Sequence, residues 1–535
     1  MISISTMQLD PRHWARVEPA RVAVQMGGAT LTYAGLEAQS NQLARVFRER
    51  GLQPGEHVAG LLRDGPFALV VAWAAWRSGV YLTPVSTALS APDAAYIVAN
   101  CLARLVIVDV RYTHFDVWQS ARTQDGLHWF SHGGACDGGE GVAGGEGRAG
   151  WERIEAAMAA QSGLPRAEET PGGLMMYTSG TTGAPKGVLR PLPPASFRGT
   201  APFAADLIAL FRLDATVRYL STAPLYHAAP LRFALAVTAA GGTVVALDGF
   251  DAELALHALE TCAITHSQWV PSMFQRLLKL PDERRARFRA PAHRVALHAA
   301  APCPRDLKRA MIGWWGPILL EYYSGTEGIG LTMIDSHEWC ARPGSVGRAV
   351  KGIPHVVDAE GRELSAGEVG EIFFSGIPPF QYFGDQGKTG KRTHALGWQT
   401  LGDVGYLDDA GYLYLTDRLD DMIISGGVNV YPQEIEEAIR ELPEVLDCAV
   451  VGGADASFGE RPIAFLVGKA GIAPDALIEL TRAHCAERLG RIKRPDRFVA
   501  VSSVPRSATG KLLRRQLRSC DPHTKRPEAA PDMPK

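Results

Sequence analysis

Short apolar runs alternate with helical patterns along most of this 535-residue chain. Five runs have the length and composition of buried strands, namely residues 104–110, 174–179, 242–247, 294–300 and 318–324. Helical patterns lie between them, for example over residues 252–261 and 271–280. This alternation predicts α/β layers around a mainly parallel sheet. In such sheets ligands bind beyond the carboxyl ends of the strands.

The chain is too long for a single domain, because hydrophobic cores stop growing at roughly 250–300 residues. A charged cluster at residues 417–421 precedes a compact pattern of strands and helices, one of which has an apolar face. We therefore predict an N-terminal domain over residues 1–419, an α+β C-terminal domain over residues 420–520, and a tail without fixed structure over residues 521–535.

Composition excludes several classes of protein. The 55 basic and 57 acidic side chains give a net charge of −2, whereas a nucleic-acid-binding protein usually has a basic excess. The eight cysteines are scattered, without the spacing of metal ligands or of a disulfide framework. The glycine-rich stretch over residues 132–150 is typical of a flexible surface segment, and His132 and Cys136 within it are poor metal-site candidates.

The chain has no sequence feature that indicates export or membrane insertion. The N-terminus lacks a basic stretch followed by an apolar run, so no signal peptide is expected. The longest apolar run, residues 68–76, is too short to cross a bilayer and favours a buried helix. We expect a cytoplasmic protein with no integral membrane segment.

The sequence YTSGTTGAPKGV, residues 177–188, has the composition of a phosphate-binding loop. Its glycines let backbone N–H groups approach an anion, its hydroxyls add donors, and Lys186 adds a positive charge. It is not a Walker A loop, because Lys186 follows Pro185 and Gly187 stands where a hydroxyl residue would be. Because the loop follows a predicted strand, we expect it at the carboxyl end of a sheet strand; the alternative is a solvated turn.

Five further motifs follow in a set order, at residues 223–230, 321–328, 397–408, 417–436 and 505–517. Together with the loop they resemble the adenylate-forming, AMP-binding superfamily, in particular its acyl-CoA synthetases and fatty-acid–CoA ligases. The resemblance runs from about residue 32 to residue 517. It implies an N-terminal domain of layered α/β subdomains with an additional β-barrel-like part, and a small, mobile α+β C-terminal domain.

The resemblance also implies the reaction. A carboxylic acid and ATP would give an acyl-adenylate and pyrophosphate, and a thiol would then attack the adenylate. The expected cofactors are ATP, Mg²⁺ and CoA. The loop would hold the β- and γ-phosphates through Thr178, Ser179, Gly180, Thr181, Thr182, Gly183 and Lys186.

The motif EYYSGTEG, residues 321–328, supplies further nucleotide contacts by this resemblance. Tyr323 would stack on adenine, and Thr326 would donate to the α-phosphate. Ala300 is a further candidate, both for cofactor binding and for the wall of the acid pocket. Glu327 is the magnesium candidate, together with Thr178, since Mg²⁺ takes one or two carboxylates along with phosphate oxygens and waters. Without the resemblance, Glu327 could be a helix cap.

Asp403 and Arg418 are the candidate ribose-binding residues. An ionised carboxylate can accept hydrogen bonds from both ribose hydroxyls, and Arg418 would assist from the domain boundary. The alternative is that GDVGYLDDAGYLYL only forms a β-hairpin with a DDAG turn. We expect that hairpin too, with Asp403 preceding it.

The C-terminal domain contributes the remaining reactive groups. Lys511, in SATGKLL, would bridge the substrate carboxylate and the α-phosphate, whereas the neighbouring Arg514 and Arg515 are interpreted as surface charges. Asp420 corresponds to the family hinge. Gly426 and Gly427 would let the backbone pass close to the pantetheine arm of CoA.

The acid pocket is defined mainly by Tyr322 and Ser324. In relatives that take acetate, a tryptophan follows the adenine-stacking aromatic residue, and Ser324 stands there in this chain, which opens space for a larger acid. The remaining candidate wall residues are His227, Trp269, Val270 and Ala299. The candidate catalytic residues are Lys511, Thr178, Glu327 and His227.

The leading interpretation is an AMP-forming carboxylate–CoA ligase for a medium- or long-chain fatty acid or a bulky hydrophobic acid. The alternatives are an aryl (4-coumarate-like) or bile- or steroid-acid CoA ligase, and an enzyme that loads an acyl-carrier protein. A non-catalytic relative is disfavoured because Lys511, Glu327 and Asp403 are all present. We expect no nucleic-acid partner, and a homodimer remains an open arrangement.

Overall fold

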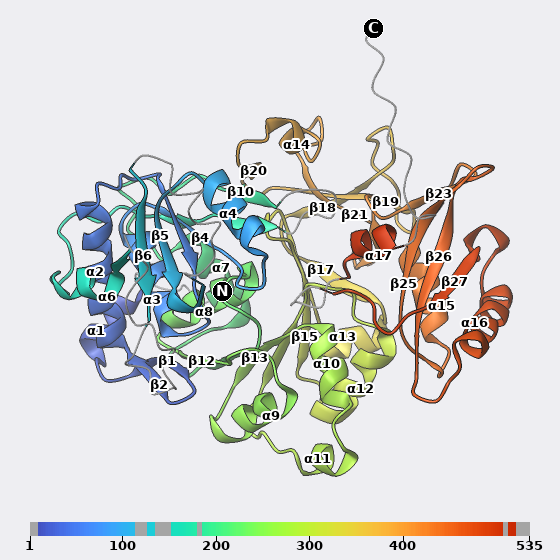
Figure 1. Cartoon of the computed structure of the whole chain (residues 1–535), viewed down its shortest axis with the longest axis horizontal. Coiled ribbons are helices and arrows are strands. Elements are labelled where there is room, and N and C mark those ends of the chain that lie inside the picture. The colour runs from blue at the N-terminus through green and yellow to red at the C-terminus, as the bar shows by residue number, and fades with distance from the viewer. Residues whose placement is uncertain (1–8, 113–125, 134–150, 179–184, 507–511, 521–535) are drawn as a thin grey trace, which may run out of the picture.

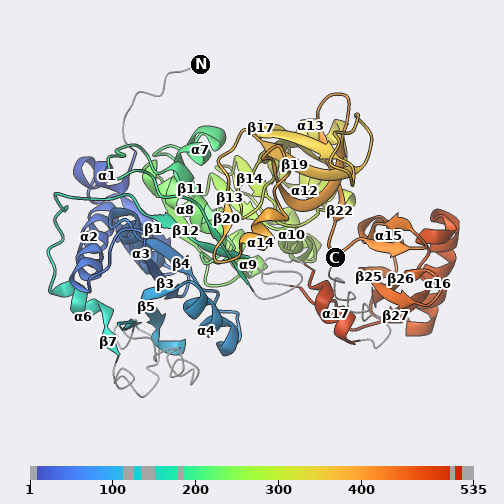
Figure 2. The same cartoon turned by 90° about the horizontal axis from the view of Figure 1, so that it is seen from above.

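The computed structural model describes residues 9–112, 126–133, 151–178, 185–506 and 512–520. They form a large N-terminal part and a small C-terminal part that lies beside it (Figures 1 and 2). The large part contains two parallel sheets with helices between and outside them, together with an antiparallel region. The layered α/β fold with a second, smaller domain is the one that the sequence predicts.

Six neighbouring parallel strands form one half of a thirteen-stranded sheet. In spatial order they are β1 (Val22–Met26), β12 (Thr243–Ala246), β11 (Arg218–Ser221), β13 (His266–Trp269), β14 (Val295–His298) and β15 (Leu319–Tyr323). The predicted strands at residues 242–247, 294–300 and 318–324 are confirmed as β12, β14 and β15. Helices α9 (Ala252–Thr261), α10 (Pro271–Leu278) and α12 (Arg305–Trp315) share an apolar core with this sheet.

A second, six-stranded sheet is parallel throughout. Its order is β7 (Glu152–Arg153), β6 (His128–His132), β5 (Ala103–Asp109), β3 (His57–Leu61), β4 (Tyr81–Pro84) and β8 (Gly173–Leu174). Helices α2 (Tyr33–Glu49), α3 (Pro66–Arg77) and α8 (Ala228–Ala239) share one core with strands of both parallel sheets. The apolar run at residues 68–76 is therefore a buried helix, α3, as predicted.

The other half of the thirteen-stranded sheet is antiparallel, and so is β2 (Ala29–Thr32), which pairs with β1 at the opposite edge. Its strands are β16 (Leu331–Asp335), β17 (Ser345–Lys351), β22 (Leu413–Arg418), β21 (Gln399–Leu407), β19 (Gly370–Ser375) and β18 (Ile353–Val357). A small sheet of β20 (Gln381–Tyr382), β10 (Lys186–Leu189) and β9 (Met176–Thr178) shares an apolar core with it. This β-rich region corresponds to the predicted barrel-like part, built in the described residues as two sheets around one core.

The C-terminal part has its own sheet and its own core. Its strands are β23 (Ile423–Ser425), β24 (Val428–Val430), β25 (Val445–Asp455), β26 (Gly459–Gly468) and β27 (Arg497–Ala500). Its helices are α15 (Pro432–Arg440), α16 (Pro474–Arg488) and α17 (Arg514–Cys520). Ile435 and Ile439 of α15 are fully buried, as its apolar periodicity predicts.

Among the described helices, none combines the length and the hydrophobicity that crossing a membrane requires.

Candidate active site

Three of the predicted nucleotide-binding residues form one hydrogen-bonded group. The Tyr323 hydroxyl, at the end of β15, donates to Asp403 Oδ2 at 2.6 Å. Arg418 Nε lies 3.1 Å from Asp403 Oδ1, and the Asp403 carboxylate raises the pKa of Arg418. Asp403 was expected to precede the hairpin. It lies inside the hairpin instead, because it is paired with Arg418 across β21 and β22. Its buried carboxylate retains further lone pairs for a diol.

Glu327 lies beside this group, in the loop that joins β15 to β16. Tyr382 donates from its hydroxyl to Glu327 Oε1 at 2.9 Å, and Lys186 Nζ lies 5.2 Å from the centre of the Tyr382 ring. Gly325 makes the tight approach possible, since a Cβ there would lie 2.7 Å from a Leu401 methyl group and 2.9 Å from Glu327 Oε2. Tyr382 thus connects the predicted magnesium and phosphate residues.

Two arginines hold the backbone of the Glu327 loop. Arg190 donates to the carbonyl oxygens of Glu327, at 2.6 Å, and of Gly328, at 2.8 Å. Arg232 of α8 donates to the carbonyl oxygen of Thr326 at 3.1 Å. Burial lowers the pKa of Arg232 to about 10, so its guanidinium remains charged at neutral pH. Neither these two arginines nor Tyr382 was predicted from the sequence, because neither spacing nor periodicity relates them to residues so distant in the chain.

The phosphate-loop candidates are only partly described. Thr178 ends β9 and pairs with Lys186 of β10 in an antiparallel register. The loop therefore follows a sheet strand, as expected, but β9 belongs to an antiparallel sheet and not to either parallel one. The remaining predicted residues of the loop, 179–183, and Lys511 lie outside the described residues.

The acid-side candidates separate onto two faces of the sheet. Gln268 Nε2 donates to the Tyr322 hydroxyl at 2.6 Å, and Gln268 Oε1 accepts from the Tyr219 hydroxyl at 2.7 Å. Trp269 follows Gln268 on β13, so its side chain points to the opposite face, where it packs on Phe274 and donates to Ser267 Oγ at 2.6 Å. Gln268, and not the predicted Trp269, therefore contacts Tyr322.

The other acid-side residues lie near the ends of strands and helices. His227 precedes α8, and its buried Nε2 has no hydrogen-bond partner among the described residues. Burial lowers the pKa of His227 to about 4, which keeps its imidazole neutral at pH 7.

Val270 and Ala299 are buried after β13 and β14. Ala300 has a φ of 76°, a left-handed conformation that is unusual for alanine. Ser324 Oγ donates to the Gly330 carbonyl oxygen at 2.7 Å.

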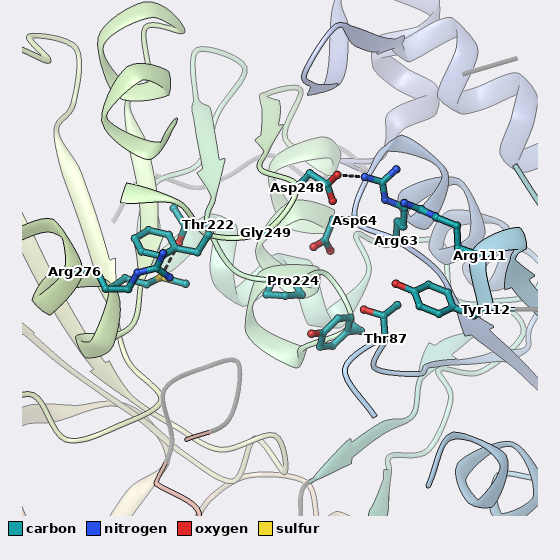
Figure 3. Close-up of a pocket in the computed structure, with 13 residues that line it drawn as sticks. Arg63, Asp64, Thr87, Arg111, Tyr112, Thr222, Pro224, Asp248, Gly249 and Arg276 are labelled. Atoms are coloured by element: carbon teal, nitrogen blue, oxygen red, sulfur yellow. Dashed lines mark hydrogen bonds and ion pairs between the residues drawn. The ribbon is translucent and has the colours of Figure 1, made fainter. Parts of the chain in front are cut away.

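A pocket of about 530 Å³ lies where the two parallel sheets meet (Figure 3). Its lining residues follow β3, β4 and β5 of one sheet and β11, β12 and β13 of the other. This position obeys the rule that ligands bind beyond the carboxyl ends of parallel strands. The charged side chains that line it are Arg63, Asp64, Arg111, Asp248 and Arg276. Such a lining suits a polar, anionic ligand.

The pocket arginines differ in how they are held. Arg63 pairs with Asp248, and Arg111 makes two 2.8 Å contacts with the Asp109 carboxylate. Arg276, on α10, lies over the Phe250 ring with its guanidinium carbon 4.6 Å from the ring centre. Arg276 makes no ion pair among the described residues, so a ligand can engage its guanidinium without breaking one, unlike Arg63 and Arg111.

The predicted residues of the C-terminal domain have distinct surroundings. Gly426 and Gly427 form the turn between β23 and β24, with φ values of 57° and 80° that favour glycine. Asp420 lies in the turn after β22 and pairs with Arg392 at 2.9 Å. Arg514 is not a surface charge, contrary to expectation: it is largely buried and pairs with Glu436. The side chain of Arg515 lies outside the described residues.

Comparison with known proteins places this site in a family. The AMP-binding enzyme family matches residues 11–381, and the AMP-binding enzyme C-terminal domain matches residues 434–511. The chain is 31% identical over 519 residues to the fatty acid–acyl-carrier-protein ligase ScoC of Streptomyces coeruleorubidus, with 94% of each chain covered. It is 30% identical over 522 residues to an indoleacetate–CoA ligase of Aromatoleum aromaticum, covering 95% of this chain and 96% of the relative.

A solved structure shows the same fold with nucleotide. The crystal structure of ATP-bound MatB from Rhodopseudomonas palustris matches with a TM-score of 0.79 and 27% identity, over 96% of this chain and 99% of that chain. The chain therefore belongs to the AMP-binding enzyme family and is an adenylate-forming acid–thiol ligase, as its motifs predict.

Proposed function

We propose that the protein is an ATP-dependent, AMP-forming carboxylate–CoA ligase that activates a medium- or long-chain fatty acid or a bulky hydrophobic acid. The observation that carries this proposal is the grouping of Tyr323, Asp403 and Arg418 beside Glu327, Tyr382 and Lys186. The first three provide an aromatic ring and a hydrogen-bonding carboxylate for a nucleoside. The others provide a carboxylate and a cation for its phosphates.

The nucleotide would bind with its ribose hydroxyls on Asp403 and its adenine on Tyr323. The hydrogen bond from Tyr323 to Asp403 fixes both side chains before the ligand arrives, which reduces the ordering needed on binding. Thr326 would donate to the α-phosphate, and Lys186 would contact the departing pyrophosphate together with residues 178–183.

The residues around Glu327 fit a magnesium ion that is bound mainly by phosphate. Among the described residues, no group of three or more His, Cys, Asp or Glu side chains is placed to hold a metal ion. Mg²⁺ is often bound by one or two carboxylates plus phosphate oxygens and waters, so Glu327 with Thr178 is sufficient. When bound, the ion would neutralise phosphate charge, while Tyr382 orients the Glu327 carboxylate.

Charge repulsion between the acid and ATP is the main obstacle to adenylation. Arg232 supports the approach of the two anions, because its guanidinium lies beside Thr326 and interacts with Glu327. Lys511 would add the second positive charge. Preorganised charges of this kind stabilise a transition state without reorganisation.

The pocket at the sheet edges would bind the nucleotide end of CoA. Arg63, Arg111 and Arg276 line it, and its volume of about 530 Å³ is within the range of ligand pockets. A carrier protein brings only a phosphopantetheine group to the enzyme and would leave most of these side chains unused. The pocket therefore supports CoA as the thiol.

Arg276→Gln is expected to raise the KM for CoA about tenfold or more, because one charge-assisted hydrogen bond contributes about 1.5–3 kcal/mol. The KM values for ATP and the acid should not change. Pantetheine, which lacks the nucleotide, is the control thiol, and its KM should be the same in both enzymes. A rise in KM for pantetheine as large as that for CoA would contradict the assignment.

The second candidate is an enzyme that loads an acyl-carrier protein, because the 31%-identical relative ScoC is a fatty acid–acyl-carrier-protein ligase. One assay separates the two candidates: AMP formation with a panel of carboxylic acids, with either CoA or a phosphopantetheinylated carrier protein as the thiol. Turnover with the carrier alone would replace CoA in the proposal. AMP formation with no acid of the panel would argue against the hydrophobic-acid proposal itself.

Ser324→Trp is expected to shift acid selectivity toward short chains. The indole would fill space that the hydroxymethyl group leaves open, and each buried methylene of a longer acid contributes about 0.8 kcal/mol of binding. Wild-type enzyme should use medium- or long-chain acids well, bulky aryl or alicyclic acids less well, and acetate poorly. The Tyr322 ring, hydrogen-bonded to Gln268, would narrow one side of the proposed acid pocket and disfavour flat cinnamates. The measurement is kcat/KM along a chain-length series.

Ser324→Ala is the matched control for this experiment. It removes the hydrogen bond from Ser324 to the Gly330 carbonyl without filling the pocket, so the chain-length profile should stay that of the wild type. A wild-type preference for acetate, or an unchanged profile in Ser324→Trp, would contradict the pocket assignment.

A further inference from the structure

A single turn connects the two parts of the protein. Strand β22 ends at Arg418 in the thirteen-stranded sheet, and β23 begins at Ile423 in the C-terminal sheet. The backbone N–H groups of Asp421 and Met422 both donate to the Arg418 carbonyl oxygen at 3.0 Å. The connection is therefore a tight turn. How freely its backbone can change conformation depends on the contacts that its side chains make.

Asp420 is held by the N-terminal part. Arg392 Nη2 donates to Asp420 Oδ2 at 2.9 Å. Arg392 itself is fixed: its carbonyl oxygen accepts from Thr400 N at 3.0 Å, and its guanidinium lies over Gly402, where any Cβ would come within 1.7 Å of Nη1. Glycine at position 402, with a φ of 78°, thus leaves the space that the arginine occupies.

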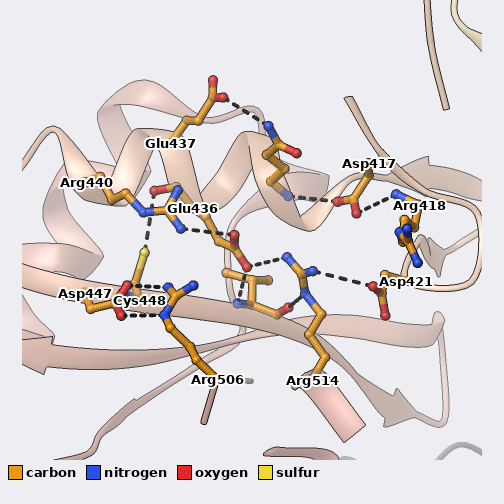
Figure 4. A network of polar contacts seen from close by, with 12 residues as sticks. Asp417, Arg418, Asp421, Glu436, Glu437, Arg440, Asp447, Cys448, Arg506 and Arg514 are labelled. Carbon is orange, nitrogen blue, oxygen red and sulfur yellow. Dashed lines mark hydrogen bonds and ion pairs between the residues drawn. The ribbon is translucent and has the colours of Figure 1, made fainter. Parts of the chain in front are cut away.

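Asp421, the next residue, is held by the C-terminal part (Figure 4). Arg514 of α17 lies 3.5 Å from Asp421 Oδ2 and donates to Glu436 Oε1 at 2.6 Å and to the Val450 carbonyl oxygen at 3.1 Å. Arg518 lies 3.4 Å from Asp421 Oδ1. Through Arg514, the turn is thus connected to α15, β25 and α17.

Two adjacent aspartates are therefore anchored to opposite domains. We infer that Arg392 and Arg514 are positioning residues that confine the rotation of the C-terminal domain to the junction of Asp420 and Asp421. The inference rests on the proposed function, in which Lys511 serves adenylation and Gly426 and Gly427 serve thiol transfer from the same domain. Breaking the Arg392–Asp420 pair frees the C-terminal domain from the orientation that it has in this structure. Breaking the Arg514 contacts uncouples the turn from α15 and α17.

A partition experiment tests this inference. Arg392→Gln is assayed separately for acid-dependent ATP–pyrophosphate exchange and for acyl-CoA formation from supplied acyl-adenylate. The rate of the half-reaction that uses the domain orientation of this structure should fall, and the rate of the other should stay the same or rise. The ratio of the two rates should change at least tenfold. The Tm should stay close to that of wild type. Asp420→Asn should have the same effect, and combining the two substitutions should change the ratio no further.

Arg514→Lys tests the second anchor. Lysine keeps the positive charge but cannot present the planar fork that contacts Glu436, Asp421 and Val450 together. We expect the ratio of the two rates to change by at least threefold. The matched control is Arg488→Gln, which breaks a bidentate pair with Glu441, at 2.8 Å for each contact, on the surface of the same domain and should leave the ratio unchanged.

The outcomes separate the inference from the function on which it rests. A ratio within twofold of wild type in both Arg392→Gln and Arg514→Lys overturns the inference, as does an equal loss of both half-reactions with a lowered Tm. If none of the acids tested supports pyrophosphate exchange by the wild-type enzyme, the result counts instead against the proposed function.

Discussion

Lys511→Ala is expected to lower acid-dependent adenylation by about 10²–10³-fold, because removing one group that stabilises transition-state charge typically has this effect. Lys511 would neutralise the substrate carboxylate and the α-phosphate as they approach each other. Thioester formation from supplied acyl-adenylate should stay within a few-fold of wild type, since that step no longer brings two anions together. ATP–pyrophosphate exchange measures the first step, and acyl-CoA formation from the adenylate measures the second.

The matched control is Lys493→Ala. Lys493 is another lysine of the C-terminal domain, and its ammonium group pairs with Glu434 at 2.6 and 2.8 Å on the surface. Both half-reactions should be unaffected by its loss, because surface ion pairs contribute little. Equal losses in the two half-reactions of Lys511→Ala would contradict the role assigned to Lys511.

Local pattern was enough to predict several of the elements that build the site. The runs at residues 242–247, 294–300 and 318–324 became strands of one parallel sheet, in which β14 and β15 are neighbours, because strands buried on both faces are continuously apolar. The helix expected over residues 252–261 has those bounds as α9. Run 174–179 differs: it is divided between β8 and β9, which belong to different sheets. Its length gave no sign of that break.

Contacts between distant residues could not be predicted from local pattern. Tyr382 and Glu327 are 55 residues apart, and only the folded chain shows that they share a hydrogen bond. Arg514 looks like a solvated charge in sequence, and its burial depends on carboxylates 78 and 93 residues away. Period-2 alternation could have indicated that Gln268 and Trp269 face opposite sides of β13, but not which side faces Tyr322.

The same limit applies to the pocket between the parallel sheets. The pocket lies beyond the carboxyl ends of parallel strands, where ligands bind in such sheets, whereas from the sequence this rule was applied to the loop that begins at Thr178, which joins antiparallel strands. Six separate strand ends converge on the pocket, and no motif links them. Family motifs indicated the candidate nucleotide residues, whereas topology located the polar pocket.

Asp403→Ala is expected to lower kcat/KM for ATP by about 10²-fold, mainly through a higher KM. Each hydrogen bond to a charged group contributes about 1.5–3 kcal/mol, and two ribose hydroxyls would lose an ionised acceptor, so a loss of about 3 kcal/mol is a low estimate. The substitution also leaves the Arg418 guanidinium without the carboxylate that it contacts at 3.1 Å. Initial rates at varied ATP, with acid and CoA saturating, measure the effect.

Two variants make the Asp403 experiment specific. Tyr323→Phe removes the 2.6 Å hydrogen bond to Asp403 but keeps the ring and the carboxylate, so its KM for ATP should rise less than that of Asp403→Ala. Asp408→Ala removes an aspartate from the turn of the same hairpin, where it accepts from Ala410 N and Tyr412 N, and should change stability without changing the KM for ATP. If Asp408→Ala and Asp403→Ala raise that KM equally, the effect comes from the hairpin fold and Asp403 does not bind the ribose.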